Sequence, residues 1–200
     1  MAKANWLKTD PSSGSGNGSV KVSSTSEHTG RVARSTVVTF KAANVDDVPR
    51  TVNQAGKPEY VDIDDTASSS KEGKTVTISG VSNSRKLTFS LGSGNLNISL
   101  PTTYKANSVT TNNGAVISGD PGASAMYNFS IAISCPANTG TSELTRQIVV
   151  TDDAGNQDAC LLTLASGDAY ITIAEGTIEL DYKGTPVTVE VKSNTSWTVE

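Results

Sequence analysis

The chain has 200 residues, of which 36% are hydrophobic and 5% aromatic, and its formal net charge is −4. About two residues in five are Ser, Thr, Asn or Gly, a mixture that favours strands and turns over helices. So little apolar material predicts thin cores, like that of a β-sandwich filled from two inner faces, and argues against a deep enzyme core. The 16 Lys and Arg are scattered, so we expect no basic face and no nucleic-acid partner.

Residues 1–8 contain no apolar run of the kind found in a signal peptide. No stretch approaches the roughly 18 apolar residues of a membrane span. We therefore expect a chain that is made in the cytosol and left there, without a membrane partner, unless a leader has been cut from the sequence.

Short runs with period-two alternation or many β-branched residues recur along the chain and predict strands. In chain order they lie at residues 19–22, 35–40, 75–78, 87–91, 127–133, 147–151, 160–164 and 186–191. Turn clusters separate them at residues 12–18, 112–114, 120–122 and 153–156. No window shows a sustained helical period, so we predict an all-β protein of sandwiches or barrels.

The chain also repeats itself, with a period of about 110 residues that matches the size of one immunoglobulin-like sandwich. Residues 29–39 are echoed at 139–151, residues 55–63 at 166–173, and residues 73–83 at 184–194. These echoes place boundaries near residues 57 and 168. We expect the closing half of a sandwich at 1–57, a complete sandwich at 58–168, and the opening half of another at 169–200.

Residues 102–119 have no counterpart in the repeat and are rich in Thr, Asn and Ser. Their Asn-Gly turn predicts an added hairpin. We expect this hairpin to be a partner-contact element rather than a core strand pair, and its candidate contact residues are Tyr104, Val109, Asn113 and Val116.

The two cysteines, Cys135 and Cys160, end and begin predicted strands that run in a sheet of alternating direction. Such positions fall at opposite ends of the sheet, farther apart than the roughly 7 Å limit between the Cα atoms of a disulfide. We therefore predict two free, buried thiols in a chain that folds in reducing conditions.

The sequence offers no recognisable set of nucleophile, base and oxyanion donors, so we predict a non-catalytic protein without a cofactor. The single histidine, His28, lies in a turn where the repeat has Asn138, and we expect it to be a solvated turn residue. The acidic clusters at residues 46–47, 62–65 and 152–153 have no complete ligand-loop spacing. Solvated turns are the expectation for them, and a calcium site is the alternative.

Two tryptophans, Trp6 and Trp197, are candidates for stacking on a sugar ring, because an exposed indole offers a flat apolar face. Each lies in an apolar-polar strand context, which favours a core position instead.

The pattern at residues 177–199, with Thr-Ile-Glu-Leu, Gly184, Val-Thr-Val and Ser-Asn-Thr-Ser-Trp, resembles the opening of a BACON module. Residues 5–56, with Asn-Trp-Leu, a Ser- and Gly-rich turn, Arg34 and a terminal Gln-Ala-Gly, resemble its later half. BACON modules are immunoglobulin-like domains of Bacteroidetes named as carbohydrate-associated. The middle of the chain departs from the pattern, with Lys86 and Leu87 in place of Trp197 and with the added hairpin.

BACON-type modules also occur in virion proteins of crAss-like phages that infect Bacteroides. The resemblance thus implies a structural protein of a phage particle, on the capsid surface and made in the host cytoplasm, with a major capsid protein and copies of itself as partners. The alternative, from another class, is a carbohydrate-binding module of a bacterial or phage surface protein.

Residues 193–200 read on into residues 2–11 as one uninterrupted BACON-like sequence. A partial sandwich leaves an apolar face and strand edges uncovered, so neither half is expected to be stable alone. We expect residues 169–200 of one chain to complete residues 1–57 of a neighbour by strand donation. The rival interpretation is that the sequence is an excerpt of a longer modular protein.

Overall fold

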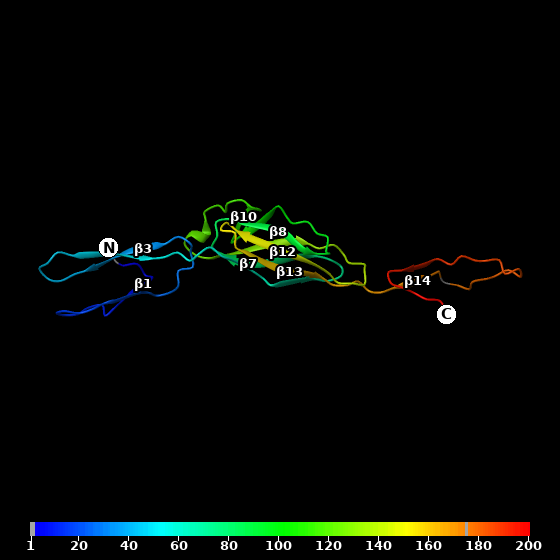
Figure 1. Cartoon of the computed structure of the whole chain (residues 1–200), viewed down its shortest axis with the longest axis horizontal. Coiled ribbons are helices and arrows are strands. Elements are labelled where there is room, and N and C mark those ends of the chain that lie inside the picture. The colour runs from blue at the N-terminus through cyan, green and yellow to red at the C-terminus, as the bar shows by residue number, and fades with distance from the viewer. Residues whose placement is uncertain (1–2, 175) are drawn as a thin grey trace.

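A computed structural model describes residues 3–174 and 176–200, and it shows an elongated molecule with a sandwich at its centre (Figure 1). Two hairpins project from one pole of this sandwich and a third projects from the other pole. The strands are β1 (Leu7–Asp10), β2 (Lys21–Ser24), β3 (Arg34–Phe40), β4 (Val48–Gln54), β5 (Val61–Ile63), β6 (Thr66–Ser69), β7 (Thr75–Ser82), β8 (Leu87–Gly94), β9 (Thr103–Ala106), β10 (Val109–Asn112), β11 (Tyr127–Ser134), β12 (Leu144–Asp152), β13 (Gln157–Leu164), β14 (Ile171–Ile173) and β15 (Val191–Ser193), with a 3₁₀ turn η1 (Pro121–Ala123) before β11.

The central sandwich contains two sheets. One has the strand order β10-β9-β11-β7-β5 and the other the order β6-β13-β12-β8. All pairings within them are antiparallel except that of β6 with β13, which is parallel. The predicted all-β class of immunoglobulin-like sandwiches is confirmed.

The core of the sandwich follows from alternation along its strands. In β11 every second residue is buried, from Tyr127 through Phe129 to Ile133, and β7, β12 and β13 show the same pattern. Because successive side chains of a strand point to opposite faces, this places one apolar row per strand between the sheets. The ring of Phe89 on β8 lies with its centroid 5.1 Å from Tyr104 and 5.8 Å from Phe129, joining the two layers.

Cys135 and Cys160 are free and buried, as predicted. Cys135 follows β11 in one sheet, and Cys160 lies on β13 in the other. Burial raises the pKa of both thiols, that of Cys160 to about 11, so both are held in the neutral form. The two side chains serve as small apolar residues of the core.

The prediction that the hairpin at 102–119 stands outside the core is wrong. Its first strand, β9, pairs with β11 as well as with β10, and Tyr104, Ala106 and Ile117 are almost completely buried. The hairpin extends the first sheet, because its alternating residues continue the apolar face of β11.

Of the four candidate contact residues, Val116 alone is fully on the surface, 63% exposed, whereas Tyr104 is buried in the core. Asn113 is half-buried and binds the backbone of Phe89 in both directions, at 2.7 and 3.0 Å. Val109 is half-buried at the start of β10. The side chain of Tyr104 is therefore not available to a partner, and Asn113 has a structural role.

The neighbouring residues Ile117 and Val116 provide a matched test of this placement. Ile117 is 1% exposed, so Ile117→Ala should lower the free energy of unfolding by about 2–5 kcal/mol in urea denaturation. Val116→Ala should change it by less than about 0.5 kcal/mol. Equal effects of the two substitutions would show that the hairpin is not part of the core.

Candidate functional site

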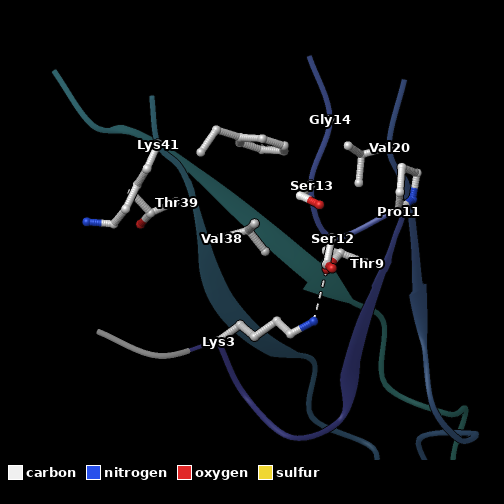
Figure 2. A pocket seen from close by; sticks show the side chains of 11 residues that line it. Lys3, Thr9, Pro11, Ser12, Ser13, Gly14, Val20, Val38, Thr39 and Lys41 are labelled. Atoms are coloured by element: carbon white, nitrogen blue, oxygen red, sulfur yellow. Dashed lines mark hydrogen bonds between the residues drawn. The ribbon is translucent and has the colours of Figure 1, made fainter. Parts of the chain in front are cut away.

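A cleft of about 500 Å³ opens between the two N-terminal hairpins, β1–β2 and β3–β4. Figure 2 shows Val38 of β3 on one side of it and Val20 with the turn at residues 11–14 on the other. Phe40 and the cations Lys3 and Lys41 also line it, and the Lys3 ammonium donates a hydrogen bond of 3.0 Å to Thr9 Oγ1. The cleft has an apolar floor and basic residues at its margin.

Several apolar side chains in and beside this cleft are partly exposed. Phe40 is 42% exposed, and Val20 and Val22 are 39% and 40% exposed. In the central sandwich, Ile148 and Val150 of β12 and Ile131 of β11 are at most 1% exposed, because the facing sheet covers them. At the N-terminal end Leu7 and Val38 are already covered, at 4% and 9% exposed, whereas Phe40, Val20 and Val22 are left partly exposed.

The C-terminal segment presents the same kind of surface. Ile173 is 53% exposed, whereas Ile63, which the sequence repeat aligns with it, is 2% exposed. Val187 and Val189 are 51% and 37% exposed. Their counterparts on β7, Val76 and Ile78, are 8% and 0% exposed. Both ends of the molecule thus carry apolar side chains that are partly exposed.

The predicted strand at 186–191 forms only at Val191–Ser193. Its counterpart β7 has β5 on one side and β11 on the other, whereas β15 pairs with β14 alone among the described residues. Without a second neighbour, residues 186–190 have no ladder to extend into, so the strand stays short.

The joint between the N-terminal hairpins and the sandwich is built around the side-chain amide of Asn83, which is fully buried. Its Oδ1 accepts a hydrogen bond of 3.0 Å from the Tyr60 backbone N–H. Its Nδ2 lies 3.3, 3.2 and 3.1 Å from the carbonyl oxygens of Thr29, Lys57 and Pro58. One side chain therefore fixes the chain on both sides of the joint.

The same contacts recur at the other pole, around Asn194. Its Oδ1 accepts a hydrogen bond of 3.0 Å from Tyr170 N–H, and its Nδ2 donates to the carbonyls of Thr139 and Asp168 at 2.8 and 2.9 Å. The preceding serine also repeats its role, since Ser193 Oγ donates to the Tyr170 carbonyl at 2.8 Å. The two joints are structurally equivalent and hold their hairpins in the same way.

The β-pairing beside each joint is equivalent too. Val61 pairs with Ser82 where β5 meets β7, and Ile171 pairs with Ser193 where β14 meets β15. The C-terminal hairpin therefore repeats the register of the first strand pair of the central sandwich.

Backbone contacts and an ion pair strengthen the first joint. The amide nitrogens of Arg31 and Val32 donate to Gly122 and Ala123 at 3.0 Å each, which brings residue 30 so close to η1 that a Cβ at Gly30 would lie 2.3 Å from Ser124. The Arg31 guanidinium binds Asp120, and this hydrogen bond raises the pKa of Arg31 further.

The prediction that His28 is a solvated turn residue is wrong. His28 is 6% exposed, and its Nε2 donates to the Val32 carbonyl at 2.7 Å. Asn138, its counterpart in the repeat, is also buried and donates to the Ser142 carbonyl at 2.8 Å. Both side chains close the same four-residue turn beside a joint, so the role of His28 is structural.

The two tryptophans lie at opposite ends of the described chain and do not form one site. Trp6 is half-buried, and the Arg34 guanidinium lies 4.6 Å from its ring centroid, so one face of this indole is covered. Trp197 is 49% exposed. Of the two, Trp197 has the more accessible ring.

The acidic clusters support the backbone near their own turns. Asp64 Oδ2 accepts from the Ser79 amide at 2.9 Å, and Asp152 Oδ1 accepts from the Asn156 amide at 2.8 Å inside the turn between β12 and β13. Across residues 3–174 and 176–200, no three His, Cys, Asp or Glu side chains are placed to hold a metal ion.

A search for membrane spans gives a similar outcome. In the part of the chain that the structure describes, no helix has the length and apolar character to cross a membrane.

The fold is that of an immunoglobulin-like sandwich, with partly exposed apolar side chains at each end of the molecule. Residues 1–55 match the model of the BACON family, described as "Putative binding domain, N-terminal". The residues that line the cleft all lie within the matched range. No curated protein matches the chain.

Substitution of the joint asparagines tests their role. Asn83→Ala leaves three carbonyls and one N–H without their buried partner, and each such group costs about 1–3 kcal/mol. We expect the sandwich to lose at least about 2 kcal/mol in urea denaturation, against less than about 0.5 kcal/mol for Asn17→Ala in the exposed 12–18 turn.

Asn194→Ala should act differently, because Asn194 holds only the C-terminal hairpin. It should leave the urea midpoint of the sandwich unchanged and speed the hydrogen exchange of the Tyr170 amide. An Asn83→Ala protein as stable as the parent would contradict the assignment of these residues as joints.

Proposed function

We propose that this chain is a non-catalytic structural protein that assembles by strand donation, with residues 169–200 of one copy completing residues 3–57 of the next. The observation that carries this proposal is the exposure of Ile173, Val187 and Val189, whose counterparts in the central sandwich are buried, together with the partial exposure of Val22 on β2 and Phe40 on β3. Covering such rows contributes about 25 cal/mol for each Å² of apolar surface removed from water.

The two ends supply complementary parts of one sandwich. The N-terminal end has two hairpins, which correspond to the later strands of the central sandwich. The C-terminal end has β14 and β15, which correspond to β5 and β7, followed by the segment around Trp197, which corresponds to β8. In the central sandwich β7 pairs with β11 and β8 pairs with β12. The C-terminal end supplies strands of the β7 and β8 kind, and the N-terminal end supplies strands of the β11 and β12 kind, so the strands of one end can pair with those of the other.

Contact between copies fits the geometry better than closure within one copy. The N-terminal and C-terminal hairpins lie at opposite poles of the sandwich (Figure 1). The joints of Asn83 and Asn194 hold each of them against its pole. A donor end and an acceptor end at opposite poles make a head-to-tail contact, which propagates into rings, lattices or filaments.

Such propagation suits a protein that clads a particle. We therefore propose an auxiliary or decoration protein of a phage virion, bound to a major capsid protein at the capsid surface and made in the cytoplasm of the bacterial host. This context rests on an analogy: residues 1–55 match the BACON family model, and BACON-type modules occur in virion proteins of crAss-like phages.

Self-association of the full chain tests the proposal. Size-exclusion chromatography with light scattering should show oligomers that grow with protein concentration. Val187→Asp with Val189→Asp should abolish them, because both substitutions place charge on the apolar face. Thr188→Asp, on the opposite face of the same segment, should retain them.

A monomer at every concentration would contradict strand donation. Co-purification with capsids in stoichiometric amounts would support the virion context, and its loss in the double Asp variant would link the two.

A carbohydrate-binding module is the second candidate function, favoured by the family description as a binding domain and by the half-exposed ring of Trp197. Binding to a glycan array by the native chain, lost on Trp6→Ala or Trp197→Ala, would support it. A native chain that binds no glycan but assembles would leave strand donation as the function.

A further inference from the structure

The register of the central sandwich indicates which donor side chains would face the cleft. There, β8 runs antiparallel to β12, with Leu87 opposite Asp152 and Phe89 opposite Val150. The Val-Val-Thr sequence of β3 repeats that of β12, so Val38 corresponds to Val150 and Phe40 to Asp152.

On the donor side, Trp197 and Val199 are the two apolar side chains that alternate after Asn194, as Leu87 and Phe89 do after Asn83. One residue fewer separates Trp197 from Asn194, and the intervening turn accommodates this difference. Transferring the register places Trp197 opposite Phe40 and Val199 opposite Val38.

The other sheet gives an independent placement. In the central sandwich Ile131 of β11 lies opposite Ile78 of β7. Val189 of the donor corresponds to Ile78, and Val20, which lies just before β2 and lines the cleft, is the apolar residue that we place opposite it. Val20, Val38 and Phe40 all line the cleft, so both sheets direct donor side chains into the same space.

We propose that Trp197 of a second copy fills this cleft and is the anchor of the contact between copies. This inference rests on the proposed strand donation and names the residue that would stabilise it most. A cleft of about 500 Å³ has room for an indole, and Trp is among the side chains that most often dominate interface energies. Trp197 is 49% exposed in the single copy, so it has surface left to bury.

Charge identifies a second copy of this chain as the occupant. Residues 1–57 carry eight Lys and Arg against four Asp and Glu, a net +4. Residues 169–200 carry two against five, a net −3. In the transferred register Lys21 on β2 lies diagonally across from Glu190 on the outer face, within reach of a long side chain. A neutral glycan would leave this complementarity unused.

Fluorescence of Trp197 in the full chain tests the proposal directly. Trp6→Phe removes the other indole. Light scattering and emission are then followed together over a concentration series. The emission should shift to shorter wavelength and become resistant to acrylamide as oligomers form.

Paired substitutions locate the anchor. Trp197→Ala should raise the Kd of self-association about tenfold or more, with a smaller rise for Trp197→Phe. On the acceptor side, Phe40→Ala should have an effect like that of Trp197→Ala. Val45→Ala is the matched control, because Val45 is 65% exposed at the same end but does not line the cleft, and it should leave the Kd unchanged.

A cross-link tests the register without relying on these variants. Lys21→Cys with Thr188→Cys should give a ladder of disulfide-linked copies under oxidation, and Lys21→Cys with Pro186→Cys should not.

Oligomers that form while Trp197 is still exposed, or that Trp197→Ala does not weaken, would overturn the role of Trp197 as the anchor but would leave strand donation standing. A chain that never self-associates would overturn both strand donation and the role of Trp197 in it. A shift of the Trp197 emission that only a glycan produces would show that this indole binds carbohydrate instead.

Discussion

A sheet with one apolar face is stable only when a second layer covers that face, and this constraint governs the whole molecule. At the centre two sheets satisfy it, and Ile131 and Leu162 are removed almost completely from water. At each end the hairpins have fewer strands around them, and Phe40 and Ile173 remain about half exposed. The centre has enough strands to form two facing layers, and each end has too few to cover its apolar side chains in this way.

Polar contacts rather than apolar packing hold the parts together. Asn83 and Asn194 each place one amide among backbone groups from segments that are distant in sequence. A buried amide is directional and costly to leave unpaired, so it fixes orientation more strictly than apolar contact does. Both joints use the same contacts, and they hold the hairpins at opposite poles of the sandwich (Figure 1).

The surfaces that this arrangement exposes are suited to association rather than to chemistry. The cleft at the N-terminal end combines apolar side chains with strands that lack a second neighbour, and basic residues lie at its margin. His28, the only histidine of the chain, is engaged in closing a turn. The match of residues 1–55 to a binding-domain family lies on the end that bears the cleft.

The sequence by itself determined the all-β class, most of the central strands and the free cysteines, because alternation and turn residues are local signals. The spacing of its repeat also located Asn83 and Asn194 at equivalent positions, although not their role. The sequence missed β1, β4, β5 and β6, which are short or polar, and it misplaced His28 and Tyr104. Only the tertiary structure decided what is buried: Tyr104 looks like a surface residue until β9 is seen beside β11, and Phe40 looks like a core residue until the layer across from it is seen to be missing from the described chain. Burial depends on neighbours that are distant in sequence, and a local pattern carries no information about them.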